Sequence, residues 1–285
     1  MRPFKQVDVF TAVAYQGNPL AVVLDGSDLS HGEMQRFARW TNLSETTFLL
    51  APTDPAADYR VRIFTPDSEL PFAGHPTIGS CHAWLELGGT PADESTIVQQ
   101  CGAGLVTLRR DAGRLAFAAP PLIRSGSVDE ADVTRVCRLL RIDRSAVLDA
   151  QWAHNGPAWI AVRLAGVDEV LAIDPDAGAV QGRGVGVVGS SPVGVVAIDD
   201  SGRDGAIEVR AFFRSGGQLA EDPVTGSLNA ALAQWLLATG DLSAPYTARQ
   251  GGAMGRSGRV HVDEADGEIW IGGDAVTCIE GEVAL

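Results

Sequence analysis

Two glycine-containing turns that run directly into helical patterns are the segments best suited to chemistry. They are Pro71–Gly79 (PFAGHPTIG) and Ala220–Asn229 (AEDPVTGSLN). Unpaired N–H groups at the start of a helix attract an anion, and a glycine lets the backbone approach that anion closely. Two such helix starts on one cleft would hold a small acid by its carboxylate. The alternative is a pair of well-capped helices that serve only the core.

Ionisable and hydroxyl side chains accompany both turns. His75 can exchange a proton near neutral pH, Asp222 supplies a carboxylate, and Ser227 supplies a hydroxyl group. Each of these residues alone is common in proteins of any function. Together, beside two helix starts, they favour an active cleft that binds a small acid.

Strands and helices must position these turns, and hydrophobic periodicity predicts them. Ser30 followed by Glu33 predicts a capped helix that ends near Thr41. A buried helix is expected over Pro76–Leu87, ended by two glycines, and another helix over Glu130–Leu140. The strands expected in the first part of the chain are Gln6–Phe10, Leu20–Leu24, Thr46–Leu50 and Tyr59–Phe64.

The same order of elements occurs twice along the chain. An asparagine and a proline precede an apolar strand at Pro19 and again at Pro157, and a strand, a polar loop and a helix follow in both places. We align the glycines of the two helices as Gly79 with Gly226. The repeat is far longer than a solenoid repeat, so we predict two similar α+β halves that face each other across a cleft. Chance similarity of two β-loop-α units is the alternative.

The repeat divides the chain into three parts. We expect a first α+β half over residues 1–118, a second over 119–258, and a strand-rich tail over 259–285 that completes the first half. The segment Ala119–Ser127 is rich in proline and contains glycine, which suits a junction between the halves.

The charge balance excludes several kinds of partner. The chain has 22 Lys and Arg against 36 Asp and Glu, a formal net charge of −14. Such a surface repels nucleic-acid phosphates and anionic lipids, so we expect neither as a partner. The sequence has no apolar run of 18 residues and no secretion signal, so we expect no membrane span and a cytoplasmic location.

Two further patterns are interpreted as structural. The segment Gly184–Gly189 (GVGVVG) matches the letters of a dinucleotide-binding motif, but no helical pattern follows it, so we interpret it as a glycine-rich turn. The four cysteines are scattered without the spacing of a zinc site, and no metal site is predicted. They are Cys81, Cys101, Cys137 and Cys278.

Three motifs as a set resemble a known family. They are Asn42–Thr46 (NLSET), Ala73–Gly79 (AGHPTIG) and Asp222–Ser227 (DPVTGS), preceded by the turn Gly17–Pro19. In this order, and over nearly the whole chain, they resemble the PhzF-like isomerases of phenazine biosynthesis. The resemblance implies a fold like that of diaminopimelate epimerase, in which two pseudo-symmetric halves each wrap a curved, mostly antiparallel sheet around a central helix. It also implies a homodimer and no cofactor.

The resemblance assigns roles by position. Glu45 matches the family's general acid and base, which moves a proton within a small carboxylated ring. His75 and Asp222 match residues that assist proton movement or hold the substrate, and Asp222 is expected to be protonated, paired with His75 or bound to a substrate ammonium group. Ser227, with the backbone at Gly74 and Gly226, matches groups that bind the substrate. The family's named reaction is the isomerisation of trans-2,3-dihydro-3-hydroxyanthranilate.

Related racemases and epimerases use two thiols that this chain lacks. In those enzymes a cysteine precedes the glycine of each helix-opening turn, and we place Ala73 and Asp222 at the matching positions. The sequence therefore disfavours a two-thiol racemase. Two alternatives to the isomerase remain: an amino-acid epimerase that uses Glu45 with a second non-thiol base, and a catalytically silent protein that binds a small acid.

Overall fold

The computed structural model describes the chain except for residues 112, 177, 179–190, 202–203 and 216. The predicted glycine-rich turn at Gly184–Gly189 lies outside the described residues. By backbone contacts the chain forms two units, Met1–Ala118 with Trp270–Leu285, and Ala119–Ile269. Each unit is described below by itself.

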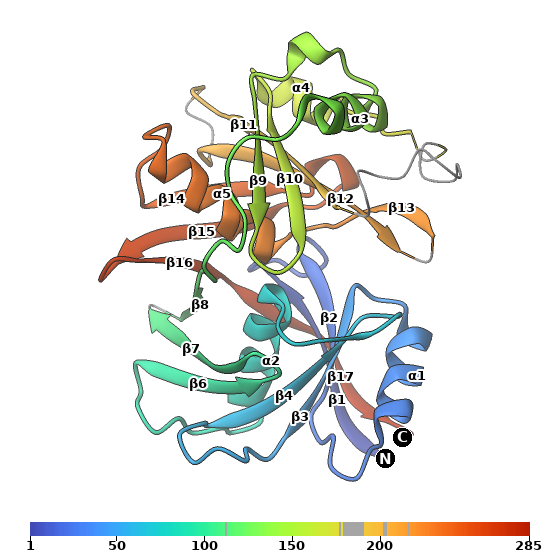
Figure 1. Ribbon diagram of the computed structural model, residues 1–285. Coiled ribbons are helices and arrows are strands. Elements are labelled where there is room, and N and C mark those ends of the chain that lie inside the picture. The colour runs from blue at the N-terminus through green and yellow to red at the C-terminus, as the bar shows by residue number, and fades with distance from the viewer. Residues whose placement is uncertain (112, 177, 179–190, 202–203, 216) are drawn as a thin grey trace. The chain divides into compact units, whose positions relative to one another are not determined.

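The first unit places two helices on opposite faces of one curved sheet (Figure 1). Its helices are α1 (His31–Thr41) and α2 (Gly74–Glu86). Its strands are β1 (Arg2–Val9), β2 (Asn18–Val23), β3 (Glu45–Leu50), β4 (Tyr59–Phe64), β5 (Glu69–Leu70), β6 (Thr96–Cys101), β7 (Gly104–Asp111), β8 (Arg114–Ala118), β17 (Ala275–Val283) and the end of β16 (Glu268–Gly273).

Helix α2 is the central helix of this unit. It contacts β1, β2, β3, β8 and β17, and nine of its thirteen residues are buried. The helix lies so close to the sheet that a Cβ atom at Gly79 would stand 2.6 Å from a methyl group of Leu20 and 2.8 Å from one of Val9. Gly79 therefore serves helix–sheet packing.

Helix α1 covers the other face of the sheet. Its buried side chains pack with those of β2, β3 and β4 in a cluster that includes Phe37, Phe48 and Phe64. The rings of Phe48 and Phe64 meet edge to face, with centroids 5.6 Å apart. The predicted cap of α1 is confirmed, because the Ser30 and Glu33 side chains and backbone groups bond reciprocally.

The second unit repeats this plan. Its helices are α3 (Glu130–Leu140), the short α4 (Val167–Leu171) and α5 (Gly226–Ala238), with 3₁₀ turns at Arg144–Ala146 and Gly252–Met254. Its strands are β9 (Asp149–His154), β10 (Ala158–Arg163), β11 (Val193–Ile198), β12 (Ile207–Ser215), β13 (Gln218–Glu221), β14 (Tyr246–Gln250), β15 (Gly258–Ala265) and the start of β16.

The pairing of strands shows how closely the units correspond. In the first unit β2 pairs parallel with β3, β3 antiparallel with β4, and β4 parallel with β6. In the second, β10, β11, β12 and β14 pair in the same senses. Helix α3 covers one face in a cluster with Trp152 and Phe212, and α5, nine of whose thirteen residues are buried, is the central helix. The predicted α+β class, with two similar halves of mostly antiparallel sheet around central helices, is confirmed.

The structure corrects the predicted alignment of the two central helices. Phe64 of β4 pairs with Glu69, and Phe212 of β12 pairs with Glu221, and in each unit the central helix begins five residues after that glutamate. Gly226 therefore corresponds to Gly74, and the predicted match with Gly79 is wrong because α2 begins earlier than the predicted start at Pro76.

The strand-rich tail predicted over 259–285 is divided in the structure. Strand β15 pairs antiparallel with β14, which keeps residues up to Ile269 in the second unit. Strand β17 pairs antiparallel with β1, from Arg2 with Val283 to Val9 with Ala275, and so belongs to the first unit. Both ends of the chain thus lie in the first unit (Figure 1).

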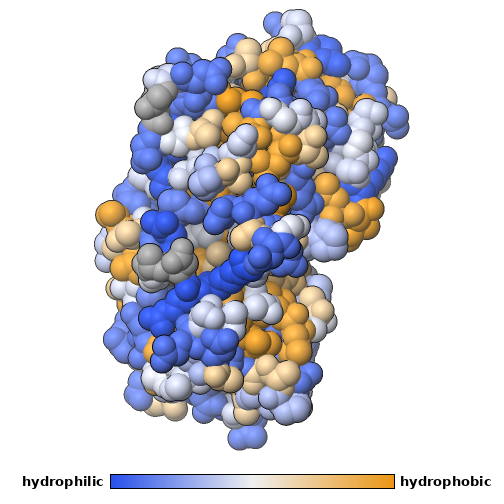
Figure 2. Space-filling model, turned by 90° about the vertical axis from the view of Figure 1, so that its left-hand side faces the viewer, coloured by the Kyte–Doolittle hydropathy of each residue, from blue (hydrophilic) through white to orange (hydrophobic). Residues whose placement is uncertain are grey.

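The described helices include none that is long and apolar enough to cross a membrane. On the face drawn in Figure 2, hydrophilic residues cover most of the surface and hydrophobic residues form small patches between them.

Candidate active site

Glu45 stands at the start of β3, directly after a helix end. Helix α1 ends at Thr41, and its C-cap Asn42 has a left-handed φ of 56°, a conformation that asparagine tolerates better than most residues. The chain then turns into β3, where Glu45 pairs with Leu20 of β2. A hydrogen bond of 2.9 Å between the hydroxyl groups of Thr41 and Thr46 joins the helix end to the strand start. The predicted general base is therefore positioned by strand pairing with β2 and by the bond that joins the helix end to the next residue of β3.

His75 is the second residue of α2 and is almost completely buried. Its Nε2 atom lies 3.4 Å from the Oε2 atom of Glu45, longer than an ordinary hydrogen bond. Catalytic contacts of this kind often shorten only when substrate binds. Burial lowers the pKa of His75 to about 3, so its imidazole is neutral at physiological pH. A neutral histidine here donates or accepts one hydrogen bond without adding charge beside the carboxylate.

The residue before α2 has an extended backbone and does not cap the helix with its side chain. Ala73 is extended, with φ −153° and ψ 141°, and places no side-chain hydrogen bond on the first turn. Gly74 and His75 therefore begin a helix whose first N–H groups are not capped by Ala73, and Pro76 has no N–H to satisfy. Further along, Thr77 accepts a hydrogen bond of 3.0 Å from Gln99 of β6, which fixes the helix on the sheet.

The second unit gathers Asp222, Gly226 and Ser227 at the start of α5. The Asp222 Oδ2 atom accepts a hydrogen bond of 2.6 Å from the Thr225 hydroxyl. Thr225, the N-cap of α5, directly precedes Gly226. The prediction that Asp222 matches the position of Ala73 is therefore wrong, because Ala73 is an N-cap and Thr225 is its counterpart. Asp222 lies three residues earlier, in the turn itself.

The side chain of Gln250, at the end of β14, makes hydrogen bonds to this turn and to α5. Its Oε1 atom accepts from the backbone N–H of Thr225 and from the side chain of Asn229, both at 2.9 Å. Its Nε2 atom donates to the backbone carbonyl of Asp222 at 3.0 Å. Gln99 of the first unit makes a comparable contact, since each glutamine bonds to the fourth residue of a central helix. Sequence analysis missed both glutamines, although each is followed within three positions by glycine after a strand.

Ser227 is the second residue of α5 and so corresponds to His75 in α2. Its hydroxyl group accepts a hydrogen bond of 3.1 Å from the indole N–H of Trp159. Its backbone carbonyl accepts one of 2.8 Å from Asn155. Within each unit the structure thus brings the predicted site residues together at the start of the central helix. The predicted cleft between the halves stays a prediction.

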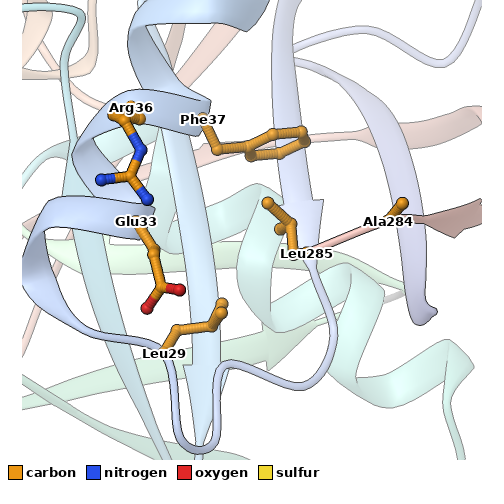
Figure 3. Close-up of a pocket in the computed structure, with 6 residues that line it drawn as sticks. All are labelled: Leu29, Glu33, Arg36, Phe37, Ala284 and Leu285. Carbon is orange, nitrogen blue, oxygen red and sulfur yellow. The ribbon is translucent and has the colours of Figure 1, made fainter.

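A cavity of about 370 Å³ lies elsewhere in the first unit, between α1 and the end of the chain (Figure 3). None of the predicted site residues lines it. Its lining residues are Leu29, Glu33, Arg36, Phe37, Ala284 and Leu285.

The cysteines do not form a thiol site in either unit. Cys81 is buried inside α2, and burial raises its pKa to about 12. Burial also raises the pKa of Cys101 and of Cys137. None of these thiols stands at a helix start, where a thiolate would be stabilised. The chemistry at both helix starts therefore belongs to oxygen and nitrogen groups.

Fold and site together define the class of protein: two repeated α+β units, each with a central helix whose uncapped start carries polar side chains, and one carboxylate beside a buried histidine. The sequence model of the family described as "Phenazine biosynthesis-like protein" matches residues 7–281. The chain belongs to this family, as its motifs predicted, and is an isomerase of it.

The chain is similar to several named proteins. The chain is 35% identical to antisense-enhancing sequence 1 of Schizosaccharomyces pombe over 98% of this chain and 97% of that protein. It is 34% identical to trans-2,3-dihydro-3-hydroxyanthranilate isomerase of Pseudomonas fluorescens, over 62% of each chain. Its fold is similar to a crystal structure of a PhzF-family phenazine biosynthesis protein of Bacillus anthracis, with a TM-score of 0.83 and 22% identity over 100% of this chain and 99% of that one.

Proposed function

We propose that the chain moves a proton within a small carboxylated substrate, with Glu45 as the general acid and base and without a cofactor. The observation that carries the proposal is the Glu45 carboxylate at 3.4 Å from a neutral, buried His75. Glu45 takes a proton from one carbon, the electron pair of that C–H bond shifts a double bond, and Glu45 returns the proton to a second carbon. The step is balanced and needs no oxidant or reductant.

Neutral His75 supports both stages of this step. A neutral imidazole that donates toward Glu45 stabilises the carboxylate when it is ready to accept a proton. Because burial keeps His75 from taking up the proton itself, Glu45 is also the group that delivers a proton to the second carbon, and exchange of the Glu45 carboxyl proton with solvent before delivery brings deuterium into the product in D₂O. Transfer of this kind by a positioned side chain contributes about 10²–10⁴-fold to the rate.

The helix starts supply groups for the substrate carboxylate. The N–H groups at Gly74 and His75 in the first unit, and at Gly226 and Ser227 in the second, have the character of anion sites. Asp222 accepts from Thr225, and in the proposal it binds an ammonium or amino group of the substrate or stays protonated. We take trans-2,3-dihydro-3-hydroxyanthranilate as the first candidate substrate, because the relative of that name has it as its substrate.

An asymmetry between the repeats favours an isomerase over an epimerase. Glu45 begins β3, whereas Pro192 and Val193 stand at the start of the corresponding strand β11. The repeat therefore carries one carboxylate at this position and not two. Inversion of a stereocentre needs a second base on the opposite face of the carbon, but a proton shift along one face needs only one. An epimerase that uses Glu45 with Asp222 is the competing assignment.

The test is proton exchange with solvent. The full chain is incubated in D₂O with the candidate substrate and with a panel of cyclic and amino carboxylic acids. We expect deuterium in the product together with a change in ultraviolet absorption, and Glu45→Gln should lower the rate by about 10²–10⁴-fold. Glu94→Gln, an exposed change in the turn before β6, is the matched control. Deuterium at an inverted α-carbon without a spectral change would identify an epimerase, and full exchange by Glu45→Gln would refute the proposal.

The assembly state is a separate proposal. The homodimer and the cytoplasmic location expected from the sequence stay predictions. Light scattering of the purified chain measures the first, and a mass near the 29.9 kDa of one chain would contradict it.

A further inference from the structure

The turn before β2 is fixed by a buried carboxylate. Asp8 of β1 is 2% exposed, and its Oδ2 atom accepts a hydrogen bond of 2.9 Å from the backbone N–H of Gly17. A Cβ atom at Gly17 would stand 2.1 Å from the carbonyl oxygen of Val9, so only glycine fits so close to β1. These contacts fix the turn against β1. Asn18, the residue after the turn, begins β2.

Asn18 places its side chain against the ring of His75. Asn18 is completely buried, and its Nδ2 atom lies 3.5 Å from the Nδ1 atom of His75. An amide NH₂ group can only donate, so the Nδ1 atom that faces it must be the acceptor. A neutral imidazole carries one ring proton, and that proton then belongs to Nε2. This is the atom that lies 3.4 Å from the Glu45 carboxylate.

The second unit repeats the contact with a different bond. Asn155, in the turn before β10, donates its side-chain NH₂ group to the backbone carbonyl of Ser227 at 2.8 Å. Ser227 occupies the same place in α5 that His75 occupies in α2. In both repeats an asparagine at or just before the start of this strand therefore contacts the second residue of the central helix. Only in the first repeat does it contact a group whose tautomer matters.

We propose that Asn18 is a positioning residue that fixes His75 as the Nε2–H tautomer, so that the imidazole donates toward the carboxylate of Glu45. The inference rests on the proposed role of Glu45 as the base. With the proton on Nε2, the ring stabilises the charged form of Glu45. With the proton on Nδ1, a lone pair would face the carboxylate and repel it. Asn18 thus acts on the reaction through His75, without contact with the reacting atoms.

The direct test is the tautomer itself. Long-range ¹H–¹⁵N correlation spectra of the full chain with ¹⁵N-labelled histidine, at neutral pH, show which ring nitrogen carries the proton. The chain has five histidines, and the His75 signals are assigned by their loss in His75→Gln. We expect Nε2–H in the wild type. A proton on Nδ1, or on both nitrogens, would overturn the proposal without any variant of Asn18.

Asn18→Asp is the sharpest substitution, because it keeps the shape and replaces the donor by an acceptor. The aspartate should draw the proton to Nδ1, lower kcat by roughly tenfold to a hundredfold, and move the acid limb of the pH–rate profile to higher pH. Asn18→Ala removes the donor alone and should give a mixture of tautomers. An unchanged Nε2–H tautomer in both variants would contradict the proposal.

Ser80→Ala is the matched control in the same helix. The Ser80 hydroxyl donates to Thr47 at 2.9 Å and is equally buried, so its loss affects stability without touching the ring. The control should retain the His75 tautomer and the pH profile. Failure of the proposed function is separate, because exchange that persists in Glu45→Gln would refute the base while the histidine spectrum still decides the role of Asn18.

Discussion

The imidazole of His75 lies 3.4 Å from the carboxylate of Glu45, although the two side chains come from different elements, α2 and β3. Only 5% of the His75 side chain and 16% of the Glu45 side chain are exposed. A carboxylate in such surroundings retains little water, so the neighbouring imidazole sets much of its electrostatic environment.

The burial of His75 makes stability depend on pH in a defined window. The folded-state pKa is about 3, whereas an unfolded histidine has a pKa near 6.5. Between these values the unfolded chain binds a proton that the folded chain does not. The free energy of unfolding should therefore fall as pH drops from about 6.5 toward 3, by up to about 1.4 kcal/mol per pH unit from this group. Above pH 6.5 the contribution is constant.

Urea unfolding of the wild type and of His75→Asn isolates this contribution, since both proteins share all other titrating groups. Below pH 6 the free energy of unfolding should fall more steeply with decreasing pH in the wild type than in the variant. The difference between the two slopes should correspond to the uptake of about one proton on unfolding. Above pH 7 the two should run parallel. Equal slopes between pH 6 and 4.5 would mean that His75 is protonated in the folded chain.

Thiol reagents should leave the reaction intact. Burial raises the pKa of Cys81 to about 12, so almost none of it is thiolate at neutral pH. We expect iodoacetamide to leave the initial rate unchanged, and Cys81→Ala to keep kcat within about twofold while it destabilises the fold by about 1 kcal/mol through a small cavity. Stoichiometric inactivation by one alkylated thiol would reopen the two-thiol mechanism.

Arg249 should be a main stabilising residue of the second unit. Its guanidinium bonds to Glu208 at 3.0 Å and to Asp199 at 2.5 Å, and Glu208 is 4% exposed. Arg249→Met leaves the buried Glu208 carboxylate without its cation, which costs about 3–5 kcal/mol. Arg249→Met combined with Glu208→Met should recover much of the loss. The measurement is chemical denaturation followed by tryptophan fluorescence.

The exposed pair of Arg144 and Glu130 is the matched control for Arg249. Water already solvates both groups, so Arg144→Met should hardly change stability. An effect as large as that of Arg249→Met would show that net charge, rather than burial, governs both results.

Substitution by alanine should change stability in opposite directions at two glycines. Gly79→Ala places a methyl group within 2.8 Å of Leu20 and Val9, and overpacking of this kind should cost about 1–3 kcal/mol. Gly32→Ala, in α1, meets only the end of the Arg36 side chain at 3.8 Å and should gain up to about 1 kcal/mol from helix propensity. Thermal unfolding measures both. A stable Gly79→Ala protein would mean that α2 can move away from the sheet.

Local sequence patterns predicted the helices and strands well. They did not predict contacts between residues that are distant in the sequence. The cap of α1 was predictable because Ser30 and Glu33 are three residues apart, and the predicted helix over Glu130–Leu140 has the bounds of α3. The start of α2 was placed too late, because Pro76 is typical of a first helical position, yet it is equally tolerated as the third residue.

The groups around the site residues needed the tertiary structure. Asn18 and His75 are 57 residues apart, and only the packing of α2 on β2 brings them together. Gln99 and Gln250 are likewise defined by strand pairing rather than by a local pattern. The motifs located Glu45, His75 and Asp222. Sequence alone could not predict which neighbouring groups contact these side chains and so decide where their protons lie.

The pairing of β1 with β17 has a consequence for synthesis on the ribosome. Strand β1 is translated before the second unit, but its antiparallel partner is translated only after that unit. The second unit can complete its sheet as a continuous stretch of nascent chain, while the first must wait with one edge of β1 open. For this protein the order of translation is therefore the reverse of the order in which the two units can finish folding.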